Sequence, residues 1–139
     1  MKRIKQSLLL LGVMLLSGVT LMAATATWTN TVDTLWATGG NWDPGVPGAG
    51  DDILFPGATP PQTVDLGGST IGIGTLTFNA TNDYTLQTGT LTLGGNVTQS
   101  GAGAVTLNST TDVGGASRTF GGTGTGVVTL SGAVTDVPS

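Results

Sequence analysis

The sequence predicts an all-β protein, a parallel β-helix of about four coils, and three observations support that fold class. Thr and Gly are the commonest residues beyond position 23, where the strong helix formers Glu and Lys are missing. Thr is β-branched and favours strands, while Gly permits the tight turns between them. Short apolar segments also recur at regular intervals. An antiparallel β-sandwich is the alternative, because it too combines many short strands with frequent turns.

Residues 1–23 have the features of a secretory signal peptide. Three basic residues lie within the first five positions, an apolar run covers 8–19, and small residues follow. This order of positive, apolar and small residues is that of a cleavable export signal. Cleavage could follow Ala23, Ala24 or Ala26, and we take residue 24 as the approximate start of the mature chain. The apolar run is shorter than the roughly 20 residues that span a bilayer, so we expect no transmembrane segment in the mature chain.

The mature chain is strongly acidic. Residues 24–139 contain eight Asp and a single basic residue, Arg118, and they lack Glu, Lys and His, so their formal net charge is −7. A surface of that sign repels phosphate backbones and anionic lipid headgroups, so we expect neither nucleic-acid binding nor peripheral membrane attachment. The chain has no cysteine. Its stability must therefore come from stacked repeats instead of disulfides.

Residues 24–57 are predicted to form an N-terminal cap and the first strand. They contain three of the six Pro and all three Trp of the chain, Trp28, Trp36 and Trp42. A solenoid exposes strand edges and its apolar interior at each end, so a covering element is a physical requirement. The alternative is that the faces of Trp28, Trp36 and Trp42 stack on the sugar rings of an extracellular glycan.

Residues 58–139 are predicted to form β-strand repeats, most clearly in three-residue segments that place Thr between two apolar residues. The clearest are Leu76–Phe78, Tyr84–Leu86, Leu91–Leu93, Val105–Leu107 and Val128–Leu130. Alternation puts the two apolar side chains on one face and Thr on the other. Each segment is therefore a short strand with one buried side.

The segment starts form three series, one for each face of a coil. They are 76, 97 and 119, then 84, 105 and 128, then 91, 113 and 134, with steps of 21 to 23 residues. Ile53, Thr63 and Ile71 extend the three series backward. A period of this length is typical of a solenoid, whose strands stack in parallel about 4.8 Å apart with apolar residues inside and Thr outside.

Several segments resemble those of a known class of exported protein. The stretch 28–55, with its parts 40–43 and 44–47, is similar to the N-terminal part of bacterial autotransporter-type passengers. Segments 74–78 and 91–95 look like the passenger-associated β-strand repeats of that family. The resemblance implies a right-handed parallel β-helix at, or released from, the cell surface of a Gram-negative bacterium. Such proteins are usually much longer, which leaves a fragment, a degenerate product, or a part that works with a partner as alternatives.

Few residue types in the mature chain can perform chemistry. Without His, Cys, Lys or Glu, the common nucleophilic and imidazole or thiolate metal sites are missing, so we expect no enzyme, no cofactor and no metal site. Asp51 and Asp52 are adjacent, but neighbours on a strand point to opposite sides, so we expect them to form a solvated corner. Arg118 is the one basic residue that a lyase mechanism could use, and we expect it instead to solvate a loop. The segment 121–126 begins like a Gly-rich calcium repeat and then has Gly in place of the ligand carboxylate.

Two functions of different classes stay open. The first is a non-catalytic exported structural module, at the cell surface or secreted, whose outer face could make adhesive contacts with a host or matrix surface. The second is a carbohydrate-binding or polysaccharide-degrading β-helix protein. In either case we expect self-association through the open C-terminal end of the solenoid, because unpaired strand edges recruit other chains.

Overall fold

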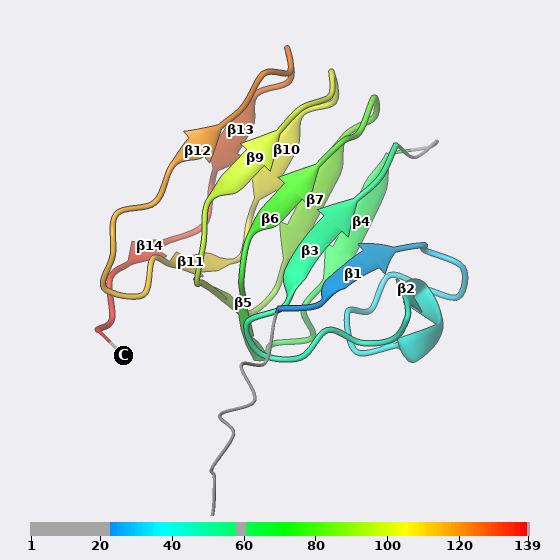
Figure 1. Ribbon diagram of the computed structural model, residues 1–139, viewed down its shortest axis with the longest axis horizontal. Helices are drawn as coiled ribbons and strands as arrows, with labels where there is room; N and C mark the ends of the chain where they lie inside the picture. The colour runs from blue at the N-terminus through cyan, green and yellow to red at the C-terminus, as the bar shows by residue number, and fades with distance from the viewer. Residues whose placement is uncertain (1–22, 58–60, 139) are drawn as a thin grey trace, which may run out of the picture.

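The computed structural model describes residues 23–57 and 61–138, so the predicted signal peptide, apart from Ala23, lies outside the described residues. The described part of the chain is nearly all β, a β-solenoid of about four turns with one short 3-10 helix, η1 (Gly39–Asn41). Figure 1 shows each coil lying beside the next, in chain order from the N-terminal region to the C-terminus. Within the described residues, no helix is sufficiently long and apolar to cross a membrane.

The strands of the described residues form three sheets, here called first, second and third. The first sheet has the order β12 (Phe120–Gly121), β9 (Val97–Gln99), β6 (Leu76–Phe78), β3 (Asp52–Phe55), β1 (Thr25–Trp28) and β2 (Trp42–Asp43). The second has the order β13 (Val128–Leu130), β10 (Val105–Leu107), β7 (Tyr84–Gln87) and β4 (Gln62–Asp65). The third has the order β14 (Val134–Thr135), β11 (Thr110–Asp112), β8 (Thr90–Leu93) and β5 (Thr70–Ile73).

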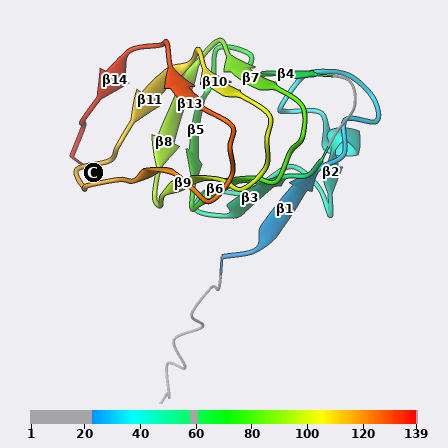
Figure 2. The ribbon, with the colours of Figure 1, turned by 90° about the horizontal axis from the view of Figure 1, so that it is seen from above.

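The pairing between coils is parallel and confirms the predicted β-helix. Along the second sheet, Thr63, Thr85, Thr106 and Thr129 are aligned from coil to coil, with their side chains on the outer face. Among the strands that the structure describes, the only antiparallel pair is β1 with β2, so the alternative of an antiparallel sandwich is wrong. Seen from above in Figure 2, β14, β11, β8 and β5 again lie side by side in this order along the stack.

Three predicted strand starts need correction. The third series was expected to pass from Leu91 to Val113, but Leu91 is aligned with Thr111, and Thr111 with Val134. The Thr111 side chain takes the inward position and is buried, whereas Val113 lies beyond the end of β11. In the first series, β12 begins at Phe120, one residue after the predicted start. In the second series, the residue aligned with Tyr84 is Gln62, one residue before the predicted Thr63.

The core is a column of side chains that point inward from all three sheets. Along the first sheet, Phe55 lies in register with Phe78, and their rings stack with centroids 4.9 Å apart and planes at 10°. The next residue of this row is Gln99, which is also buried. Burial of each large apolar side chain contributes about 1.5 to 3 kcal/mol. Because the inward residues of neighbouring coils contact one another, stacking replaces a globular core.

Corners between strands bring the backbones of successive coils into close approach. At Gly101, an added Cβ would lie 1.8 Å from the Ala80 carbonyl oxygen of the preceding coil. At Gly103, it would lie 2.1 Å from the Asn82 carbonyl oxygen. Only Gly fits such positions, because any side chain would have to occupy the space of a peptide group. The Gly-rich segments are thus the corners of the solenoid.

Candidate functional site

The three Trp side chains pack together over the first complete coil. β1 ends at Trp28 and pairs with β2, which begins at Trp42. The Trp28 and Trp42 rings meet edge to face with centroids 4.9 Å apart, and those of Trp36 and Trp42 with centroids 4.6 Å apart. The Trp42 indole N–H donates a hydrogen bond of 2.7 Å to the Trp36 carbonyl oxygen. Each Trp is at most 5% exposed and contacts Phe55, so the ring faces are covered by protein instead of open to a sugar.

A buried amide fixes the loop between these Trp residues. The Asn41 Oδ1 accepts from the backbone N–H groups of Val32 and Asp33, at 3.0 and 3.2 Å. Its Nδ2 donates to Asp33 Oδ1 at 2.7 Å and to the Leu35 carbonyl oxygen at 3.0 Å. The pKa of Asp33 is lowered, first by the hydrogen bond from the Leu35 N–H. The sequence did not single out Asn41 by its chemistry, although it lies in the 40–43 segment that carries the family resemblance.

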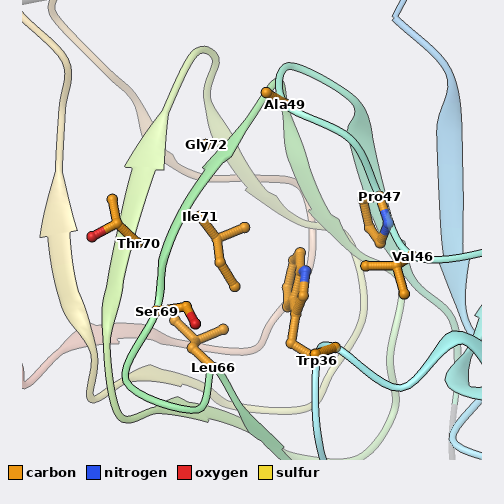
Figure 3. Close-up of a pocket in the computed structure, with 10 residues that line it drawn as sticks. Trp36, Val46, Pro47, Ala49, Leu66, Ser69, Thr70, Ile71 and Gly72 are labelled. Atoms are coloured by element: carbon orange, nitrogen blue, oxygen red, sulfur yellow. The ribbon is translucent and has the colours of Figure 1, made fainter.

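A cleft of about 290 Å³ lies between the 46–49 segment and β5. Its lining is Trp36, Ala37, Val46, Pro47, Ala49, Leu66, Ser69, Thr70, Ile71 and Gly72. Figure 3 shows the Trp36 indole standing between Ile71 on one side and Val46 with Pro47 on the other. Of the three candidate sugar-stacking residues, Trp36 alone lines this cleft. The cleft could hold a small, mostly apolar group, with the Ser69 hydroxyl as a hydrogen-bonding partner.

Aspartates link successive coils at the corners. The Asp52 Oδ1 accepts hydrogen bonds from the Thr75 N–H and the Thr75 hydroxyl, 23 residues further on and both at 2.7 Å. The other links join Asp65 to Thr88, Asp83 to the Ala104 N–H, Asp112 to the Val137 N–H, and Asp136 to the Gly115 N–H. We call these five residues the bridging aspartates. Each of them connects segments that lie about one coil apart.

Three of the bridging aspartates have lowered pKa values for this reason. For Asp52 the principal cause is the hydrogen bond from the Thr75 N–H, and for Asp112 it is the one from the Val137 N–H. For Asp65 the hydroxyl of Thr88 lowers the pKa most. Donors aimed at a carboxylate favour its charged form. These groups therefore stay ionised, held as acceptors between coils.

The adjacent Asp51 and Asp52 do not form a joint site. Asp51 accepts from the Ala24 N–H through one oxygen, at 3.1 Å, and from the Gly48 N–H through the other, at 2.8 Å. Asp52 bonds to the next coil instead. Both residues are half-buried. Their hydrogen bonds lie at solvent-exposed positions, which agrees with the expected corner, and the two carboxylates anchor different pieces of backbone.

Arg118 also has a structural contact. Its Nε–H donates to the Val113 carbonyl oxygen at 3.1 Å, which closes the loop between β11 and β12. The side chain lines a shallow hollow of about 220 Å³ along a corner, with Gly50, Gly72, Ile73, Thr92, Leu93, Gly94 and Gly114. Arg118 thus adds a structural contact within the loop that it was expected to solvate.

The comparisons with known proteins add no relative. No protein-family model, no curated protein and no solved structure matches this chain. Within the part of the chain that the structure describes, no group of three or more acidic residues is placed to hold a metal ion. What the arrangement does with its carboxylates is therefore the main guide to function.

Proposed function

We propose that this chain is an exported, non-catalytic structural module, a β-solenoid rod of the autotransporter-passenger type at, or released from, the surface of a Gram-negative bacterium. The observation that carries the proposal is the use of the bridging aspartates as hydrogen-bond acceptors between coils. Because residues 24–139 lack His, Cys, Lys and Glu, polysaccharide cleavage would have to depend on Asp, and five of the eight Asp there use at least one oxygen to join segments about one coil apart.

The direction of the pKa values supports the same conclusion. A carboxyl that acts as general acid near neutral pH needs a raised pKa, so that it still carries its proton. The hydrogen bonds to Asp52, Asp65 and Asp112 lower their pKa values instead. A glycosidase also needs two carboxyl groups facing each other across the scissile bond. Asp51 and Asp52 bind separate backbone groups and do not provide that pair.

The outer faces of the rod are its proposed contact surfaces. Along the second sheet, one row of Thr hydroxyls runs from Thr63 to Thr129 and repeats with each coil. Such a row is uncharged and rich in hydrogen-bonding groups, which suits adhesive contact with a matrix or host surface. Carbohydrate binding would be confined to the cleft beside Trp36, because the ring faces of all three Trp are covered.

Export is tested by expressing the whole chain in a Gram-negative host. We expect the N-terminus, determined by mass spectrometry, to begin between residues 24 and 27, and the product to appear outside the cytoplasm. Leu10→Arg, inside the apolar run, should leave an unprocessed precursor in the cell, whereas the matched Leu54→Arg, in the mature part, should leave processing unchanged. An unprocessed wild-type chain in the cytosol would contradict the proposal.

Catalysis and binding are tested on the same purified product. With a panel of soluble polysaccharides we expect no release of reducing ends. Release that is lost in Asp52→Asn or Asp65→Asn, with the fold intact by circular dichroism, would overturn the non-catalytic assignment. Glycan-array binding that depends on Trp36 but not on Trp42 would instead identify the cleft as a carbohydrate site.

A further inference from the structure

Arg118 is the one basic residue of the mature chain, and no carboxylate neutralises it. Residues 24–139 contain eight Asp, all within the described part of the chain. In that part, the Arg118 guanidinium makes no ion pair with any of them, and its one hydrogen bond runs from Nε–H to the Val113 carbonyl oxygen at 3.1 Å. Its terminal NH₂ groups, which are strong hydrogen-bond donors, are therefore available to a ligand.

The acidic residues closest to Arg118 in the sequence are held by other groups. Asp112 accepts from the Val137 N–H at 3.0 Å, and Asp136 accepts from the Gly115 N–H at 2.7 Å. Both carboxylates thus serve the backbone at the corner of the coil. An anion that pairs with the Arg118 guanidinium would have to come from outside the chain.

The hollow of about 220 Å³ that Arg118 lines opens on the side of the rod. Its other lining residues come from Gly50, from β5, from β8 with Gly94, and from Gly114 after β11. β5, β8 and β11 are neighbours in the third sheet. Every residue of the lining precedes β12, so the last coil takes no part in the hollow.

The space beside the guanidinium is unfilled because Gly114 has no side chain. An added Cβ at Gly114 would lie 3.7 Å from Arg118 Nη2 and 3.8 Å from Thr92 Cγ2. A group of that size therefore fits between the cation and the Thr92 methyl. At Gly72 an added Cβ would meet no heavy atom within 4 Å. The hollow thus offers open space as well as a hydrogen-bonding cation.

We propose that this hollow binds a small monocarboxylate, whose carboxylate accepts hydrogen bonds from the terminal NH₂ groups of Arg118. The guanidinium is planar and can present parallel N–H groups to both oxygens of a carboxylate. The hollow is smaller than the roughly 300 Å³ at which pockets for drug-sized ligands begin, so the rest of the ligand must be short. The Thr92 methyl and the bare backbone of Gly114 suit a short apolar body.

The charge of the protein limits the ligand to a single negative charge. Residues 24–139 carry a net charge of −7, which repels anions at long range. Arg118 can compensate one carboxylate in the hollow. The further charges of an acidic polysaccharide would meet a surface without another cation in the mature chain. The proposed site depends neither on export nor on the location of the protein.

The test is a titration of the ¹⁵N-labelled chain, purified in the form that its expressing cell leaves, at constant ionic strength and neutral pH. The probe is butyrate, and butyramide is the uncharged probe of the same shape. Nuclear magnetic resonance follows the Arg118 Nε–H and the backbone N–H groups of Gly94 and Gly114. We expect butyrate to shift these three signals until they saturate, and butyramide to leave them in place.

Two substitutions that each lower the net charge by one separate the site from a general charge effect. Arg118→Gln should weaken butyrate binding, read from Gly94 and Gly114, at least about tenfold, because a hydrogen bond to a charged group contributes that much. Val32→Asp, at a residue 65% exposed in the N-terminal cap, should bind butyrate like wild type. Arg118→Lys keeps the charge and loses the planar pair of donors, so its affinity should lie between those of wild type and Arg118→Gln.

The wild-type chain alone keeps the proposal open to refutation if Arg118→Gln does not fold. Saturable shifts with butyrate and none with butyramide would support the site. No shift with butyrate, or equal shifts with both probes, would overturn it, and so would equal butyrate affinities of wild type and a folded Arg118→Gln. Polygalacturonate that binds at these signals more tightly per carboxylate than butyrate would overturn the restriction to a single negative charge.

Discussion

Replacing Gly101 with Ala should force two coils of the solenoid apart. The new Cβ would lie 1.8 Å from the carbonyl oxygen, 2.5 Å from the carbonyl carbon and 2.7 Å from the nitrogen of Ala80. Real Cβ atoms do not approach other heavy atoms closer than 3.0 Å. The neighbour is backbone and cannot rotate away as a side chain would. One coil must therefore retreat by more than about 1 Å.

The cost follows from the hydrogen bonds at this corner. The Gly103 N–H donates to the Ala80 carbonyl oxygen at 3.0 Å, and the Ser100 N–H donates to the Phe78 carbonyl oxygen at 2.9 Å. A shift of about 1 Å takes both contacts beyond hydrogen-bonding distance. Each lost bond costs about 1 kcal/mol, and leaving its buried groups unpaired adds to that. We expect a loss of about 3 kcal/mol, in line with overpacked sites.

The matched control is Gly72→Ala in β5. An added Cβ there meets no heavy atom within 4 Å, and Gly72 does not adopt a positive φ. This substitution should be neutral or stabilise by up to about 1 kcal/mol, because Ala restricts the unfolded chain. Urea unfolding is followed by far-ultraviolet circular dichroism and by the fluorescence of the three Trp. With a slope of about 2 kcal/mol per molar urea, the midpoint of Gly101→Ala should fall by about 1.5 M. Equal midpoints for the two variants would refute the close stacking of coils at this corner.

Three further predictions concern ionisation and the core. Because the pKa values of Asp52, Asp65 and Asp112 are lowered, their hydrogen bonds stabilise the fold fully above the unfolded pKa of 3.8, and this stabilisation is lost as pH falls through the lower pKa values of the folded chain. Urea midpoints measured from pH 7 to pH 2 should therefore drop in that window, and a flat profile would contradict the hydrogen bonds between coils. Burial raises the pKa of Tyr84, the only tyrosine of the sequence, to about 12. Its ultraviolet titration should therefore have a midpoint near 12, and the stability of the fold should decrease as pH rises from 10. A midpoint near 10 in the folded chain would show that the Tyr84 hydroxyl is exposed to water. Phe78→Ala, in the stacked column of the core, should lower the free energy of unfolding by about 3 to 5 kcal/mol, whereas Val32→Ala at an exposed site should change it by less than about 0.5 kcal/mol. Similar losses for the two variants in chemical unfolding would argue against the column.

The strands and their period could be predicted because alternation along three residues directly encodes an inner and an outer face. The inward positions of the third sheet were harder to predict. Its inward position in the third coil is Thr111, and a search for apolar residues passes over it in favour of Val113. The Thr111 hydroxyl is buried without a hydrogen-bond partner in the structure. In this solenoid, a Thr can be assigned to the outer face only where a residue beside it in the strand has an apolar side chain that points inward.

The roles of the acidic residues could not be read from the sequence for a different reason. Most of their coil-to-coil partners are backbone N–H groups, which every residue but Pro carries. Such a contact leaves no mark on residue type. The spacing is also variable, from 21 residues between Asp83 and Ala104 to 25 between Asp112 and Val137. The cleft beside Trp36 likewise depends on how far the 46–49 segment stands from β5, which only the folded structure defines.

The parallel stacking of coils is tested most directly by paired cysteines in a chain that has none of its own. Thr85 and Thr106 are aligned on neighbouring strands β7 and β10, with a separation between strands that suits a disulfide. In an antiparallel hairpin of β7 and β8, Thr85 would instead lie opposite Thr92. Mild oxidation and mass-spectrometric mapping should show a disulfide in the Thr85→Cys, Thr106→Cys variant and none in the Thr85→Cys, Thr92→Cys variant. The reverse result would contradict the solenoid.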